Sequence, residues 1–300
     1  MAEEVGGQRS EAGGRRRIVA AVWRVVRPVL IAYLVVVLLM TFLETWLVYP
    51  VPPVEFGDWH PVGLEHEEIH FAADDGTRLY GWFVPHRQPK RVLLYCHGNG
   101  EDVARNADLV AHLRETLGAS VFIFDYRGYG HSAGRPDEPG CIADGLAAQR
   151  WLAERVGVAP GDVVVMGRSL GAAVAIAIGA GQGAQALVLE NAFSRMTDVA
   201  ASHYPWLPVR RLMRNRYDSL ARIAQFRGPV LQSHGTADEI VPLELARELF
   251  DAIPTHCKQF LKFPGLGHND PPPDRYYRQL AEFLDEVAAP GQADETGQAR

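Results

Sequence analysis

The sequence predicts an α/β fold in which a mostly parallel central sheet is covered by helices on both faces, preceded by one membrane-spanning helix. Continuous apolar strands alternate with helical stretches from about residue 66 onward. An alternating hairpin opens that region, and the uncharged run Val29–Leu43 precedes it. The 300 residues are 47% hydrophobic and 22% charged, which is typical of a globular protein and excludes wholesale disorder.

The N-terminal region is basic and then strongly apolar. Residues 1–27 hold six arginines against three glutamates, and we predict a basic cytoplasmic segment there. Val29–Leu43 spans roughly 22 Å as a helix, and extension through Tyr49 brings it near the ~30 Å hydrocarbon core. We therefore predict a transmembrane signal anchor over 28–49. The positive-inside rule predicts a single-pass protein whose N-terminus is cytoplasmic and whose remaining chain, with the α/β domain, is extracytoplasmic.

Two alternatives to an anchor fit the sequence less well. A cleaved signal peptide needs a small-residue cleavage site, and the bulky stretch ETWLVYPVPP offers none. A buried core helix that is apolar on all sides beside a basic cluster would be unusual. Three prolines at 50, 52 and 53 then predict a stiff linker over 50–65.

Residues 66–288 are predicted to form the α/β domain. Its opening hairpin comprises Glu67–Phe71 and Thr77–Val84 around the turn Asp74-Asp75-Gly76. The later predicted strands are Val92–Cys96, Val121–Tyr126, Asp162–Met166, Ala186–Glu190, Pro229–His234 and Gln259–Phe263. The predicted helices are Glu101–Leu117, Cys141–Arg155, Leu170–Ala180, Leu243–Ala252 and Arg275–Val287. The aromatic and arginine-rich stretch 191–227 predicts a cap, and the polar tail 289–300 is predicted to be disordered.

Two Gly-x-Ser-x-Gly motifs are present, and only the second has the context that nucleophilic chemistry needs. A nucleophilic serine of this kind sits on a strained strand-to-helix turn, which lifts its oxygen above the sheet. Ser169 follows a predicted strand and opens a helix of small residues. Ser132 lies in a loop rich in Gly and Pro, with no helix directly after it. We therefore predict Ser169 as the nucleophile and a tight loop around Ser132.

A serine nucleophile needs a base, and the base needs an orienting acid. His268 and Asp238 both directly follow predicted strands, so both lie where open sheets place their sites. Glu190 ends another strand and is a rival acid, although loop position favours Asp238. His97 is the strongest rival base, but it is better interpreted as part of an oxyanion loop.

The oxyanion hole requires two backbone N–H groups aimed at the developing negative charge. One is expected from Leu170, directly after the nucleophile. The other is expected from Asn99, in the loop His97-Gly98-Asn99-Gly100, whose glycines let the backbone approach a substrate.

Several other ligand classes are not predicted. The net charge of −6 gives no reason to expect nucleic acid, and three cysteines form neither a disulfide framework nor a zinc pair. The segment His66-Glu67-Glu68-Ile69-His70 matches a zinc motif that requires a helix, but its residues alternate as on a strand. No nucleotide-binding fingerprint is present. We predict no metal and no cofactor.

The motifs HGNG, DYRGYG, GRSLG, HGTADEIVP and GHND together resemble the α/β-hydrolase superfamily. The 190–220 stretch, together with the basic N-terminus, the anchor helix and the exit LVYPVP, resembles its membrane-anchored branch, related to the eukaryotic ABHD hydrolases and bud-emergence-type proteins. The resemblance covers about residues 28–288. It implies a serine hydrolase with aminopeptidase-like, esterase or depalmitoylating thioesterase activity. It also implies the triad Ser169, Asp238 and His268.

The leading hypothesis is a membrane-anchored serine hydrolase that cleaves small-molecule or lipid carboxylic esters or thioesters through an acyl-enzyme. A serine aminopeptidase on the same triad is the alternative, and it needs an acidic pocket for the substrate ammonium. A non-catalytic, membrane-tethered binding protein is the third hypothesis, because a fold alone does not give a function. Protein depalmitoylation would need a cytosolic active site, whereas the charge bias places the domain on the other side of the membrane.

Overall fold

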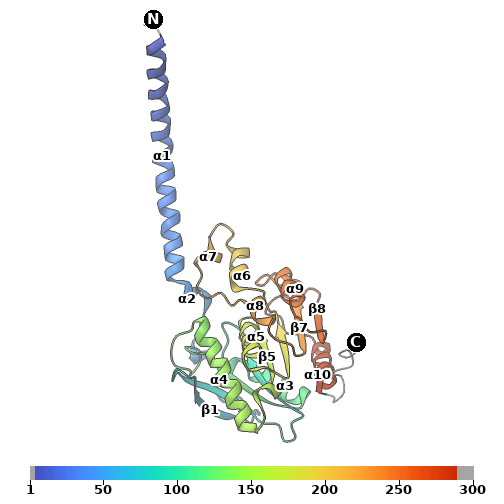
Figure 1. Cartoon of the computed structure of the whole chain (residues 1–300). Coiled ribbons are helices and arrows are strands. Elements are labelled where there is room, and N and C mark those ends of the chain that lie inside the picture. The colour runs from blue at the N-terminus through green and yellow to red at the C-terminus, as the bar shows by residue number, and fades with distance from the viewer. Residues whose placement is uncertain (1–3, 289–300) are drawn as a thin grey trace. The chain divides into compact units, whose positions relative to one another are not determined.

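The computed structural model describes residues 4–288, and the side chains of residues 20–288 (Figure 1). The chain forms two compact units, divided between Leu47 and Val48. The predicted polar tail, 289–300, lies outside the described residues. So do the side chains of residues 1–19 in the predicted basic segment.

The first unit is helical. Helix α1 (Glu4–Phe42) is followed, after Leu43, by the short helix α2 (Glu44–Val48), which runs into the first residue of the second unit. Within α1, Ala20–Phe42 is long and apolar enough to cross a membrane. Membrane anchors and signal sequences share this length and composition. Helix α1 begins at Glu4, well before the predicted start of the anchor at residue 28. It ends at Phe42, before the predicted end of the anchor at residue 49.

The second unit is built on an eight-stranded sheet in the order β1-β2-β4-β3-β5-β6-β7-β8. The strands β1 and β2 pair antiparallel, as do β2 and β4, and every other neighbouring pair is parallel. This confirms the predicted mostly parallel sheet with an antiparallel hairpin at its start. The strands are β1 (Glu67–Ala72), β2 (Arg78–Val84), β3 (Arg91–Cys96), β4 (Ala119–Asp125), β5 (Val164–Arg168), β6 (Ala186–Glu190), β7 (Val230–Gly235) and β8 (Lys258–Phe263).

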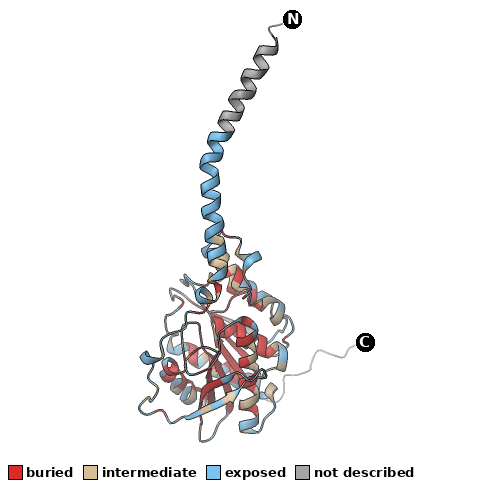
Figure 2. Cartoon of the chain, turned by 90° about the vertical axis from the view of Figure 1, so that its left-hand side faces the viewer, coloured by how far each residue is buried: buried red, intermediate tan, exposed pale blue. Residues whose placement is uncertain are grey.

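Both faces of the central strands are buried, because side chains that alternate along these strands enter two separate apolar cores. One core packs against α4 (Glu138–Val156), α5 (Leu170–Gln182), α8 (Ser219–Ile223) and α9 (Leu243–Asp251). The other core packs against α3 (Ala107–Leu117) and α10 (Asp274–Ala288). Figure 2 shows the buried residues of this unit concentrated in the sheet and in the helix faces that cover it.

Two helices begin three or more residues from their predicted starts, and local hydrogen bonds account for both shifts. A 3-10 turn (Ala104–Asn106) precedes α3, because the carboxylate of Asp102 accepts the Arg105 N–H and holds a tighter turn there. Helix α4 begins three residues before Cys141, because the Asp137 side chain accepts the Gly140 N–H at 2.8 Å and caps it.

The segment His66–His70, which matches a zinc motif but is predicted to be a strand, lies at the start of strand β1. Its histidines contact aromatic rings of the neighbouring strand: His66 lies 4.2 Å from Trp82 and His70 lies 5.3 Å from Tyr80, between ring centroids. The helix on which the zinc motif depends is not formed at these residues. The interpretation of this segment as a strand is confirmed.

The segment predicted to form a cap, residues 191–227 and called the cap below, contains α6 (Met196–His203), α7 (Val209–Leu212) and α8. Tyr49, near the start of the second unit, is hydrogen-bonded to the cap. Its hydroxyl donates to Asn215 Oδ1 at 2.9 Å and lies 2.9 Å from the Tyr217 hydroxyl. The Glu138 carboxylate accepts the backbone N–H of Tyr217 at 2.9 Å. The chain is therefore already part of the domain at Tyr49, and the predicted linker 50–65 clusters with the second unit.

Candidate active site

Ser169 occupies a sharp turn between β5 and α5. Its backbone has φ +53°, in a region that non-glycine residues rarely adopt. The flanking glycines make this turn possible: a Cβ at Gly171 would lie 2.0 Å from the Cys96 carbonyl oxygen, and one at Gly167 would lie 2.2 Å from the Gly171 carbonyl oxygen. The motif therefore has the strand–turn–helix context that the sequence predicts for it.

Ser132, in the first Gly-x-Ser-x-Gly motif along the chain, has a different environment. Its hydroxyl donates to the Asp125 carbonyl oxygen at 2.7 Å and accepts the Tyr80 N–H at 2.9 Å. Both contacts tie the loop to the sheet, and the side chain is buried. These bonds fit the predicted tight loop.

Ser169, His268 and Asp238 lie in one hydrogen-bonded chain. The His268 Nε2 is 3.0 Å from Ser169 Oγ, and its Nδ1 is 2.7 Å from Asp238 Oδ2. Asp238 follows β7 and His268 follows β8, so the parallel sheet brings both loops to the edge where β5 ends. This geometry lets the histidine accept a proton from the serine while the carboxylate orients the ring.

The Asp238 carboxylate is held ionised. Burial by itself raises the pKa of this carboxyl group, but hydrogen bonds from His268 and the Val241 N–H outweigh it and lower the pKa overall. The Ile240 and Val241 N–H groups donate to Oδ1 at 2.9 and 2.7 Å, which leaves Oδ2 for the histidine. Because the folded-state pKa is below the unfolded value, this group stabilises the fold above that unfolded value. The contribution is lost as the pH falls through the folded-state pKa.

Leu170 and Asn99 both line the cavity that contains Ser169. The Gly98 N–H is already bonded to Glu101 Oε2 at 3.0 Å. Neither Leu170 N–H nor Asn99 N–H donates a hydrogen bond to the residues the structure describes. The Asn99 side chain is fixed by Tyr129, whose hydroxyl donates to Oδ1 at 2.6 Å. These two N–H groups therefore remain the candidates for an oxyanion hole.

The cavity beside Ser169 measures about 230 Å³. Most of its wall away from the triad is apolar and comes from the cap and from the loop after β7. The apolar lining residues are Phe193, Met196, Val199, Ile240 and Val241. Pro50 and Leu170 add further apolar surface, and the polar remainder of the wall includes Glu101, Arg168 and Asn269. An acyl group fits this lining better than a charged group does.

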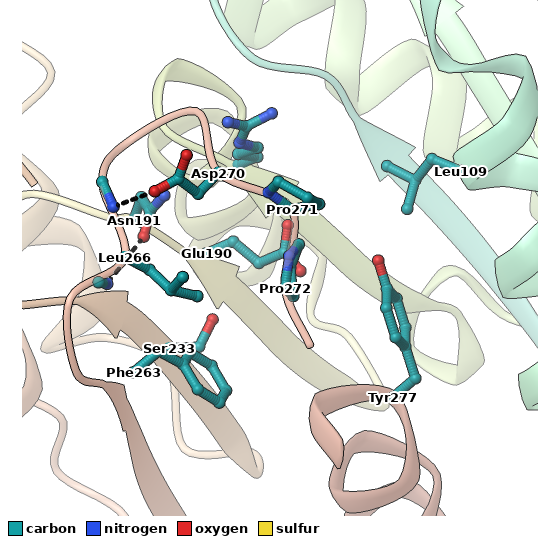
Figure 3. A pocket seen from close by; sticks show the side chains of 13 residues that line it. Leu109, Glu190, Asn191, Ser233, Phe263, Leu266, Asp270, Pro271, Pro272 and Tyr277 are labelled. Carbon is teal, nitrogen blue, oxygen red and sulfur yellow. Dashed lines mark hydrogen bonds between the residues drawn. The ribbon is translucent and has the colours of Figure 1, made fainter. Parts of the chain in front are cut away.

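The rival acid Glu190 faces a second, smaller cavity of about 60 Å³ (Figure 3). Its side chain points into that cavity together with those of Ser233 and Tyr277, which come from β7 and α10. Burial raises the pKa of Glu190. Asp270, also in this wall, accepts the Gly267 N–H at 2.7 Å and so stabilises the loop before His268. Among the described contacts, His268 bonds to Asp238 and not to Glu190.

The rival base His97, the first residue of the predicted oxyanion loop, is buried. Its Nδ1 lies 2.8 Å from the Gly98 carbonyl oxygen, and burial lowers its pKa. It does not line the cavity around Ser169. Its contacts fit a structural role within that loop.

A polar network that was not predicted from the sequence joins the loops of the site. Arg168 donates to Glu101 Oε1 at 3.0 Å and to the His268 carbonyl oxygen at 2.7 Å. Asn191 donates to the same carbonyl at 2.8 Å. Because Glu101 also accepts the Gly98 N–H, the network links the oxyanion loop, the nucleophile turn and the histidine loop. The sequence signal that could have indicated a role for Arg168 is its position inside the Gly-x-Ser-x-Gly motif, directly before Ser169.

Replacing Arg168 by glutamine is expected to lower kcat by about 10- to 100-fold with a smaller change in KM, because small displacements of catalytic groups are costly. Steady-state kinetics on a short-chain ester measure both constants. Arg155→Gln is the matched control, since Arg155 pairs with Glu67 on the surface, at 3.0 Å. Equal kinetics for the two variants would contradict a positioning role.

Known proteins resemble this chain in sequence and in fold. Residues 87–217 match the family described as serine aminopeptidase, S33. An uncharacterised protein of Mycobacterium tuberculosis (strain ATCC 25618 / H37Rv) is 45% identical over 206 residues, covering 68% of this chain and 73% of that protein. The protein bem46 of Schizosaccharomyces pombe is 32% identical over 234 residues, covering 74% and 78%. The α/β-hydrolase domain-containing protein WAV2 of Arabidopsis thaliana is 29% identical over 271 residues, covering 83% and 86%.

Solved structures share the fold at lower identity. The Pyrococcus furiosus esterase Pf2001 superimposes with a TM-score of 0.65 at 20% identity, covering 79% of this chain and 98% of that one. The fold and these relatives define an α/β-hydrolase. The chain belongs to the α/β-hydrolase superfamily and is a hydrolase.

Proposed function

We propose that the chain is a membrane-anchored serine hydrolase that cleaves carboxylic esters or thioesters through a Ser169–His268–Asp238 triad. The observation that carries the proposal is the continuous hydrogen-bonded chain from Ser169 Oγ through His268 to Asp238, which opens into an apolar cavity. The fold places all three residues in loops at the carboxyl ends of the strands, where open sheets place their sites.

The proposed reaction follows from the positions of these groups. Ser169 Oγ attacks the substrate carbonyl carbon while His268 Nε2 takes the serine proton. The carbonyl oxygen becomes an oxyanion, which the Leu170 and Asn99 N–H groups stabilise. His268 then gives the proton to the departing alcohol or thiol, leaving an acyl-serine. Water, deprotonated by His268, hydrolyses this ester and releases the acid.

The lining of the cavity favours esters and thioesters over peptides with a free amino terminus. A substrate ammonium needs an unpaired carboxylate, and Glu101 is the only acidic residue among the described lining residues. Its carboxylate is already bonded to Arg168 and to the Gly98 N–H. The match to the serine aminopeptidase family supports the alternative activity. Hydrolysis of aminoacyl arylamides with free, but not blocked, amines would favour that alternative.

The membrane part of the proposal rests on Ala20–Phe42, which has the length and composition of a spanning helix. The arginines that precede it place the N-terminus in the cytoplasm and the hydrolase domain outside it, under the positive-inside rule. Retention of the full chain in membranes after alkaline carbonate washing supports the anchor, and release contradicts it.

A series of p-nitrophenyl esters tests the substrate class. We expect the highest kcat/KM with acyl chains of up to roughly eight carbons, since 230 Å³ accommodates about eight water-sized groups. Replacing Val199 by phenylalanine narrows the cavity and is expected to shift the optimum toward acetyl esters. Val158→Phe, at an exposed loop position, is the control. A folded protein without activity on any ester or thioester, and without labelling by a fluorophosphonate, would instead favour a non-catalytic binding protein.

A further inference from the structure

The outer segment of the cap combines basic and apolar side chains that are exposed. Residues 199–217 contain four arginines and no acidic residue, in a chain whose net charge is −6. Tyr204, Trp206 and Leu212 are 43%, 56% and 39% exposed. We call this surface the cap patch, defined as Tyr204, Trp206, Arg210, Arg211, Leu212 and Arg214, all exposed.

The cap patch is tied by the chain to the end of the apolar helix. Tyr49 follows Phe42, the last residue of the candidate span, by seven residues, which reach about 25 Å at most. Tyr49 is in turn bonded to Asn215, one residue beyond the cap patch. A membrane that holds the span therefore lies within a short distance of this part of the cap.

We propose that the cap patch docks on the surface of an anionic lipid bilayer. Tyr and Trp side chains prefer the boundary between headgroups and acyl chains, and arginines near such a surface are attracted by anionic headgroups. An apolar and basic surface tethered beside a membrane has the composition of an interfacial anchor. The inference rests on the proposed anchor.

Docking would connect the membrane to the cavity of Ser169. Met196 and Val199, on α6 of the same cap, line that cavity, and so does Pro50 from the segment that enters the domain. The cavity wall is thus built from the two parts of the domain that are nearest to the bilayer in this arrangement. Esters embedded in the bilayer would reach Ser169 without crossing bulk water.

A fluorescence experiment on the full chain tests the docking. Leu212→Cys in a Cys257→Ser background is labelled with the environment-sensitive dye NBD, since Cys96 and Cys141 are buried. The labelled chain is reconstituted into nanodiscs of phosphatidylcholine alone or with 30% phosphatidylglycerol, with and without a doxyl-labelled lipid as quencher. The matched control is Val158→Cys, which precedes β5, at the sheet edge opposite the candidate active site.

We expect quenching at position 212 to be at least twice that at position 158 in anionic nanodiscs, and to fall in 1 M salt. Combined Arg211→Gln and Arg214→Gln substitutions are expected to lower the quenching at position 212 in the same way.

Equal quenching at positions 212 and 158 in a chain that stays in the nanodiscs overturns the docking and leaves the anchor intact. The docking is also overturned if quenching at position 212 is the same with and without phosphatidylglycerol and is unchanged by the two arginine substitutions. A dye shift that appears only at high protein density indicates a second copy of the chain and overturns the lipid assignment. Loss of the chain from the nanodiscs overturns the anchor and the docking together, while hydrolysis of soluble esters is measured separately.

Discussion

Alanine in place of Ser169 is expected to abolish labelling by a fluorophosphonate probe and to lower kcat by at least about 1,000-fold. The reason is that the probe and an ester substrate both react with the same activated hydroxyl, 3.0 Å from His268 Nε2. Loss of a nucleophile in a triad removes the covalent route and leaves only the contribution of the oxyanion hole and substrate binding. Gel-based labelling and ester kinetics on the full chain measure the two effects independently.

The chain supplies a matched control in its other Gly-x-Ser-x-Gly motif. Ser132→Ala is expected to keep the labelling and most of the activity, because that hydroxyl bonds to the backbone of Tyr80 and Asp125. It should lower the free energy of unfolding by about 1–3 kcal/mol, the usual cost of leaving buried polar groups without a partner. Labelling that survives Ser169→Ala but disappears in Ser132→Ala would reverse the assignment of the nucleophile.

The positions of the strands along the chain could be predicted because each apolar run is bounded by clear turn signals. The run Ala186–Glu190 is a strand with the predicted bounds, and the hairpin around Asp74-Asp75-Gly76 pairs antiparallel. The expectation that Asp238 and His268 converge on Ser169 rested on the same logic, since parallel strands end at one edge of the sheet. The 2.7 and 3.0 Å contacts then depend on loop geometry, which periodicity does not encode.

The polar network around Arg168 could not be predicted in the same way. Its partners, Glu101 and the His268 carbonyl, lie 67 and 100 residues away in the chain. No local pattern specifies which carboxylate a given arginine meets across the sheet. The structure of the cap could not be predicted from the sequence either. Its helices are short, and it is held by side chains that are distant in the sequence, such as Tyr49 and Glu138.

Position in the chain alone does not decide whether Glu190 or Asp238 is the acid that orients the histidine. Glu190 and Asp238 both come at the ends of parallel strands, and both are buried. The distinction is that two backbone N–H groups and His268 surround Asp238, whereas Glu190 Oε1 has no hydrogen-bond partner among the described residues. Burial consequently raises the pKa of Glu190, while the pKa of Asp238 is lowered in spite of its burial. An ionised acid next to the histidine is what orientation of the base requires.

Asparagine in place of Asp238 is expected to lower kcat by about 10,000-fold with little change in KM, an effect of the size known for this substitution in a serine protease triad. The asparagine amide would donate to His268 Nδ1, so that Nε2 carries the proton and cannot accept one from Ser169. Pre-steady-state acylation by a p-nitrophenyl ester measures the step directly. Glu190→Gln and Asp270→Asn are the controls, and both should keep acylation within about tenfold of the unchanged chain, because neither carboxylate bonds to the His268 ring in the described residues. A larger loss for Glu190→Gln than for Asp238→Asn would transfer the role of the orienting acid to Glu190.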